Sequence, residues 1–117
     1  MIKNDEHMDN LVSELRRGTL VLSVLSQLHV KQYGYSLVQR LSEKGLEVDQ
    51  GTLYPLLRRL EKQNLLDSDW VLEEARPRRY YVLSREGSRI LEQLTGEWDE
   101  IVRVLDRLLG RKEREEQ

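Results

Sequence analysis

The stretch Asp49-Gln-Gly-Thr-Leu-Tyr-Pro-Leu-Leu-Arg-Arg-Leu-Glu-Lys62 decides how this chain folds. Its leucines recur at the i, i+3, i+4, i+7 spacing of a helix with one buried stripe: Leu53, Leu56, Leu57 and Leu60. The opposite side of the helix carries Thr52, Tyr54, Pro55, Arg58 and Lys62. Because that side offers hydrogen-bond donors and an aromatic ring, it is suited to contact with DNA and indicates a recognition helix.

The start of this helix has two possible caps. Asp49 is a plausible N-cap, because its carboxylate can accept from the free backbone N–H groups of the first turn. Pro55 then falls inside the helix, where it lacks the N–H that would bond to the carbonyl of Gly51. Thr52 as the cap would move Pro55 into the first turn. The sequence leaves both caps open.

A second helix is expected just before the first, from about Tyr33 to Lys44, after a loop at His29 to Gln32. Its apolar residues Leu37, Val38 and Leu41 share one face, and Gly45 stands where a helix-terminating glycine belongs. Two helices joined by a short turn predict a helix-turn-helix.

Two strand-like runs follow, Leu65 to Leu72 and Arg78 to Leu83, joined by a polar connection from Glu73 to Pro77. They predict a two-stranded hairpin, the wing of a winged helix-turn-helix, with Trp70 as its anchor on the domain. Alternation along a strand means that neighbouring arginines of the second run cannot all point the same way, and Arg78 is the first candidate for DNA contact.

The remaining segments predict two helices that need a partner. From Leu11 to Leu28 the second half is apolar nearly all round, so this helix must be buried on more than one side. Ser84 caps a long helix from about Arg85 to Leu109, whose apolar residues follow a heptad spacing. A two-fold dimer is expected. Its interface residues are Leu11, Leu15, Leu22, Leu91, Leu94, Trp98, Ile101, Leu105 and Leu108.

Three motifs carry a specific resemblance. They are Tyr33-Gly34-Tyr35-Ser36-Leu37, the run Gly51 to Glu61, and Arg76-Pro77-Arg78-Arg79-Tyr80-Tyr81. In this order and spacing they resemble the PadR family of bacterial transcriptional regulators, in its short form with a single C-terminal dimerisation helix. The likeness extends from about Leu11 to about Leu109.

The resemblance implies a mainly α fold with a small β-hairpin, and a homodimeric repressor of a palindromic double-stranded operator. The expected organisation is a flexible N-terminal arm at 1–10, a winged helix-turn-helix domain at 11–83, a dimerisation helix at 84–110 and a charged disordered tail at 111–117. A small hydrophobic or aromatic effector at the dimer interface would release the DNA.

The DNA-binding candidates are Tyr35, Ser36, Thr52, Tyr54, Pro55, Arg58, Arg59, Lys62, Arg76, Arg78 and Arg79. Arg58 is assigned to a guanine, and Arg59 and Lys62 to phosphates. Tyr35 and Ser36 open the second helix, where free N–H groups can hold a phosphate. The family usually has glycine before the Arg-Pro pair, whereas this chain has Glu73-Glu74-Ala75, which argues against deep insertion of the wing.

Trp98, Leu94 and Leu22 are the effector-binding candidates, since some members of the family place an aromatic residue of the last helix at the dimer axis. Ordinary core packing is the alternative role for Trp98. Gly96 costs about 1 kcal/mol in a helix interior, and space beside Trp98 is one reason to keep it.

Composition excludes other classes of protein. The chain of 117 residues has no cysteine, which suits the cytoplasm, and it has no apolar run long enough for a membrane. Its two histidines are too scattered for a metal site, and neither a cofactor nor an enzyme activity is expected. The net charge of −2 motivates one alternative, a winged-helix protein-interaction module that does not bind DNA specifically.

Overall fold

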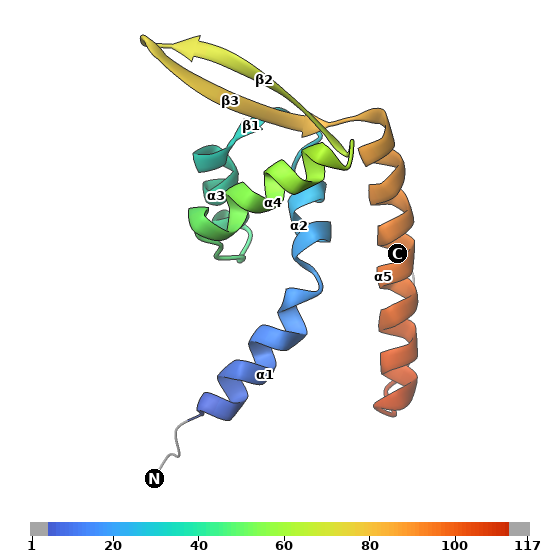
Figure 1. Cartoon of the computed structure of the whole chain (residues 1–117). Helices are drawn as coiled ribbons and strands as arrows, with labels where there is room; N and C mark the ends of the chain where they lie inside the picture. The colour runs from blue at the N-terminus through green and yellow to red at the C-terminus, as the bar shows by residue number, and fades with distance from the viewer. Residues whose placement is uncertain (1–4, 113–117) are drawn as a thin grey trace.

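The computed structural model describes residues 5–112 and shows a mainly helical winged helix-turn-helix (Figure 1). This fold confirms the predicted class. The elements in chain order are α1 (Glu6–Arg17), α2 (Leu20–Ser26), β1 (Gln32–Tyr33), α3 (Gly34–Glu43), α4 (Gln50–Lys62), β2 (Leu66–Glu73), β3 (Arg76–Leu83) and α5 (Arg85–Leu108). The first four residues of the expected arm and the last five of the expected tail lie outside the described residues.

The core lies where α2, α3 and α4 meet beneath the sheet. The leucine stripe of α4 is buried here, with Leu53 and Leu57 fully inaccessible, and Leu25 and Leu37 face them from α2 and α3. Burying one leucine side chain contributes about 1.5–3 kcal/mol. The stripe therefore fixes which side of α4 is left for solvent.

Asp49 is the N-cap of α4. Its Oδ1 accepts a hydrogen bond of 2.7 Å from the backbone N–H of Thr52. Pro55 consequently lies inside the helix, so the structure selects the first of the two caps that the sequence left open. Thr52 is the third residue of the helix rather than its cap.

The wing is part of a three-stranded antiparallel sheet in the order β1-β3-β2, not the isolated two-stranded hairpin that the sequence predicts. The strand β1 pairs Gln32 with Tyr81 and Tyr33 with Tyr80. Two residues are too few to give a visible period-2 pattern, which is why this strand reads as loop and helix start.

The two long strands are joined by only two residues, Glu74 and Ala75, because Glu73 already pairs with Arg76. Both have positive φ, at 50° and 63°, as a two-residue type I′ hairpin turn requires. The predicted connection from Glu73 to Pro77 was therefore too long. A turn with positive φ at both positions usually has the sequence Asn-Gly. Because this chain has Glu74-Ala75 there, its sequence did not indicate the turn.

The predicted helix from Leu11 to Leu28 is two helices. The break falls at Gly18 and Thr19, where the N–H of Thr19 bonds to the carbonyl of Arg16 at 3.0 Å and its hydroxyl donates to the same carbonyl. Helix α1 begins at Glu6, inside the expected arm, and none of its residues is buried. Figure 1 shows α1 and α5 both extending away from the helix-turn-helix body.

Helix α5 is fixed to the body by its first turns, through the cap at Ser84 and the packing of Ile90, Leu91 and Leu94 on the core. Ser84 caps it by accepting from the N–H of Gly87 at 2.9 Å, as predicted, and donates to the carbonyl of Asn64 at 2.7 Å. Leu91 is 8% exposed and belongs to the core of the same chain, which leaves little of it for the predicted dimer interface. No described helix has the length and apolarity needed to cross a membrane.

Candidate nucleic-acid interface

The solvent side of α4 is polar and cationic. Its exposed residues include Thr52, Tyr54, Pro55, Arg58, Arg59 and Lys62. None of the three cations among them forms an ion pair with another residue in the described range 5–112. Their charges are therefore available to an anionic partner.

Gly34, the first residue of α3, positions Tyr54. A Cβ built on Gly34 would overlap the tyrosine ring, so the ring lies directly against the backbone of this glycine. Tyr54 is left 37% exposed at the junction of α3 and α4. The sequence reasoning missed Gly34; a glycine between two tyrosines at a helix start, where it weakens the helix, is the available signal.

A hollow of about 500 Å³, here called the wing cleft, lies between the wing and the two helices of the motif. Its lining is aromatic and cationic: Tyr33, Gly34, Tyr35, Tyr54, Arg58, Trp70, Arg76, Pro77, Arg78, Arg79 and Tyr81. Six of the predicted DNA-binding residues thus meet in one place. Ser36, Thr52, Pro55, Arg59 and Lys62 are not part of the lining.

Arg79 ties the wing to α4. Its Nη2 is 2.9 Å from Oε1 of Glu61, and its Nε donates to Oγ of Ser68 at 3.1 Å. The Ser68 hydroxyl completes the network by donating to Oε2 of Glu61 at 2.6 Å. The guanidinium lies near the rings of Trp70 and Tyr81, with centroids 5.5 and 5.6 Å away. Arg79 is thereby engaged within the chain.

Arg78 is engaged on the opposite face of the sheet, as strand alternation requires. Its Nη1 is 3.1 Å from Oε1 of Glu73, and its guanidinium lies 4.5 Å from the Tyr33 ring centroid. Desolvation lowers the pKa of Arg78, but Tyr33, Tyr80 and Glu73 together raise it more. Both terminal oxygens of Glu73 also accept from the hydroxyl of Tyr80 at 3.0 Å.

Desolvation, and then the bond to Glu73, raise the pKa of Tyr80. A tyrosine phenol is protonated at neutral pH, and this shift favours the same form, in which the hydroxyl donates to Glu73. The predicted first-choice wing contact, Arg78, is thus partly neutralised by Glu73 of the neighbouring strand.

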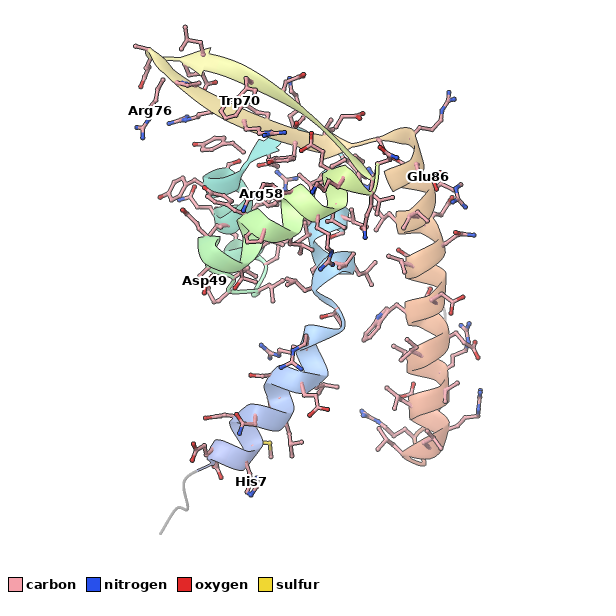
Figure 2. All side chains as sticks on the ribbon, viewed as in Figure 1. His7, Asp49, Arg58, Trp70, Arg76 and Glu86 are labelled. Carbon is pink, nitrogen blue, oxygen red and sulfur yellow. The ribbon has the colours of Figure 1, made fainter. Side chains whose placement is uncertain are left out.

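Arg76 and Trp70 are the open positions of the wing. Arg76 lies near the free end of the hairpin, as Figure 2 shows, and is exposed without an ion pair to any described residue. The side chain of Trp70 is 65% exposed, so the prediction that it anchors the wing in the domain was wrong. Trp70 pairs with Arg79 across the two strands, so the two side chains lie on the same face of the sheet.

Tyr35 and Ser36 differ in accessibility. Tyr35 is 50% exposed at the start of α3. The Ser36 hydroxyl accepts from the N–H of Tyr33 at 3.1 Å and can donate to Oε1 of Gln32 at 2.8 Å. It caps the helix and is half-buried, which leaves little of it for a phosphate.

A second hollow of about 580 Å³, here called the helix cleft, lies between α5 and the junction of α1 with α2. It is mostly apolar and is lined by Leu15, Arg16, Gly18, Thr19, Val21, Leu22, Leu94, Glu97, Trp98, Ile101 and Leu105. All three effector-binding candidates line it. A Cβ on Gly96 would meet nothing within 4 Å in this protomer, so the glycine is not needed for space here.

Within residues 5–112 no three His, Cys, Asp or Glu side chains are grouped so that they could hold a metal ion. The arrangement thus consists of a cationic, aromatic cleft beside an exposed helix and a separate apolar cleft.

Comparison with known proteins identifies the relatives of this chain. Residues 21–93 match the transcriptional regulator PadR-like family. The chain is 34% identical over 91 residues to the transcriptional regulator Rv3488 of Mycobacterium tuberculosis, covering 77% of this chain and 85% of that protein.

Solved structures agree with this match. A PadR family transcriptional regulator from Eggerthella lenta superposes with a TM-score of 0.86 at 45% identity, covering 90% of this chain and 94% of that one. Bacillus subtilis PadR, solved in complex with operator DNA, shares the fold with a TM-score of 0.62 at 17% identity, over 66% of this chain and 45% of that one. The chain therefore belongs to the PadR-like family, whose members are transcriptional regulators and not enzymes.

Proposed function

We propose that this protein is a homodimeric repressor that binds a palindromic operator through α4 and the wing. One observation carries the proposal: the exposed side of α4 presents Arg58, Arg59 and Lys62 without ion pairs to other described residues, beside a wing that adds Arg76. Unpaired cations on one face are what a polyanion needs. Bacillus subtilis PadR, which shares the fold, was solved in complex with operator DNA, and this supports DNA as the partner.

The residues of α4 divide into two roles. Arg58 reads a guanine in the major groove, while Tyr54 and Pro55 contact the methyl group of a thymine. Arg59 and Lys62 bind phosphates, which gives affinity without sequence preference. Arg78 and Arg79 act mainly within the wing, since both hold carboxylates of their own chain.

The dimer is supported by apolar residues that the described chain leaves wholly or partly exposed. Leu11 is 59% and Leu15 72% exposed on α1, and Ile101 is 48% and Leu108 76% exposed on α5. Packing this patch against a second copy of the chain removes apolar surface from water, which favours association. Two recognition helices would then read successive major grooves about 34–36 Å apart.

The helix cleft is the proposed effector site. Its apolar lining, with the indole of Trp98 39% exposed, suits a planar hydrophobic molecule. Because the cleft lies between α1 and α5, the same helices that would form the dimer, a ligand there can favour one spacing of the recognition helices over another. The repressor would release its operator in that way. The proposed site of action is the cytoplasm.

The test is fluorescence anisotropy of the protein on the intergenic DNA beside its own gene, with unrelated DNA as the control, across a salt series. Arg58→Ala should weaken binding to its own DNA about tenfold or more, because a bidentate guanine contact is lost, and should affect unrelated DNA much less. Arg103→Ala, which removes an arginine paired to Glu100 on α5, is the matched control.

Equal losses on both DNAs would reduce Arg58 to a phosphate contact. If no DNA is preferred at any salt concentration, and a pull-down recovers one protein in stoichiometric amount, the repressor proposal fails in favour of the protein-interaction module.

A further inference from the structure

Trp70 is an exposed tryptophan in the wall of the wing cleft. It lies on β2, is 65% exposed, and lines the cleft with Tyr35, Tyr54 and Arg58. Exposing a large aromatic side chain to water has an unfavourable free energy that is proportional to its exposed apolar area. A tryptophan in the wall of a hollow is a common anchor for a partner.

The chain holds this ring in place. The guanidinium of Arg79, centred 5.5 Å from the ring, is itself fixed by Glu61 of α4 at 2.9 Å. The ring therefore has a defined position relative to the recognition helix. Ser68, two residues before Trp70 on the same face of β2, bonds to both members of that ion pair.

The surroundings of Trp70 define the chemistry of its partner. The cleft contains Arg58 and Arg76, which have no carboxylate partner among residues 5–112, so it attracts negative charge. The aromatic rings in the same lining offer apolar surface. A molecule that alternates anionic groups with apolar sugar faces fits both features, and the backbone of DNA is such a molecule.

We propose that Trp70 is a DNA contact, with its indole packed against a deoxyribose of the backbone. This inference rests on the proposed function, because it adds a wing contact to the same complex. Arg79 and Glu61 are positioning residues that set the ring over the groove edge. The contact is to the backbone, so it adds affinity for any sequence.

The experiment uses Trp98→Phe, in which Trp70 is the only remaining tryptophan of the two in the chain. Anisotropy of labelled DNA and indole emission with unlabelled DNA are followed in parallel titrations, with acrylamide quenching before and after saturation. We expect the emission to change with the same midpoint as the anisotropy and the indole to become protected from acrylamide.

Trp70→Ala should weaken binding about tenfold on both the protein's own DNA and unrelated DNA. Trp70→Phe, which keeps a ring, should retain most of the affinity. Leu72→Ala is the matched control, since Leu72 is 71% exposed on the same strand but does not line the cleft.

Binding with an unprotected Trp70 indole would overturn the inference and leave the repressor proposal intact. Loss of affinity in Trp70→Ala without indole protection would have the same meaning, with Trp70 acting only on wing stability. If the anisotropy of DNA never rises with the parent protein, which keeps Trp98, the repressor proposal and the inference both fail.

Discussion

Gly34 and Gly96 show how differently two glycines of one chain can be constrained. Gly96 lies in the interior of α5, where glycine is less favourable than alanine by about 1 kcal/mol, whereas Gly34 is the first residue of α3. The ring of Tyr54 occupies the position that a side chain on Gly34 would need, whereas Gly96 faces open space. The sequence alone shows neither the contact at Gly34 nor the open space at Gly96.

Gly34→Ala should therefore move Tyr54 out of the wing cleft and weaken DNA binding, with a loss of about 1–3 kcal/mol in the free energy of unfolding from overpacking. Chemical denaturation and anisotropy check the two effects. Gly96→Ala is the matched substitution and should raise the free energy of unfolding by about 1 kcal/mol. Equal stability changes in the two variants would contradict the proposed contact between Gly34 and Tyr54.

The hairpin turn is the most strained described segment of the wing. Ala75 holds a φ of 63°, a conformation that disfavours a residue with a Cβ by about 1–2 kcal/mol. Ala75→Gly should accordingly relieve this strain and stabilise the wing by about 1 kcal/mol. The greater conformational entropy of glycine in the unfolded state offsets part of that gain. Amide hydrogen exchange of β2 and β3 measures this directly, and faster exchange in the variant would refute the turn assignment.

The first turn of α5 contains an acid-sensitive pair. The hydrogen bond from Arg89 to Glu86, 2.6 Å long, outweighs desolvation and lowers the pKa of Glu86 from its usual value. A carboxylate with a lowered pKa in the folded chain stabilises it above the ordinary glutamate pKa. That contribution is lost as the pH falls through the folded value.

Glu86→Gln should thus lower the Tm at neutral pH, and the difference from the parent protein should vanish in acid. Thermal melts across pH measure it, with Glu100→Gln on the same helix as the control. A difference independent of pH would mean that the carboxylate charge does not matter.

Some parts of the fold could be predicted from the sequence, and others could not. The periodic leucines of α4 determine the helix-turn-helix because their burial contributes far more than any local effect. The pairing of β1, the break at Gly18 and the short turn at Glu74 depend on single hydrogen bonds and φ angles, which leave no periodic signal. Among the site residues, Trp70 was misjudged because an isolated strand does not show which face is covered.

The placement of Leu91 shows a second limit. A heptad spacing marks an apolar seam but not the partner that covers each residue. In α5 the first turns pack on the protomer's own core, and only the later apolar residues remain exposed.

Ile101→Glu should consequently dissociate the proposed dimer, since it places a charge in the centre of the exposed part of the seam while leaving the core untouched. Sedimentation velocity should show a monomer. Circular dichroism should show unchanged melting of the winged helix but a lower helical content, because α1 and α5 lose the partner that covers them. Arg103→Glu, on the outer side of α5, should leave the assembly intact. A dimer that survives Ile101→Glu would place the interface elsewhere.

Helix α1 ends in Arg16 and Arg17, followed by the exposed Gly18 where the chain breaks direction. A helix of this length with no buried residue is marginal by itself in water. A protomer without a partner would therefore offer proteases a basic, readily unfolded cleavage site, whereas an assembled one would not. If the proposed homodimer forms, the lifetime of the regulator in the cell would then depend on pairing.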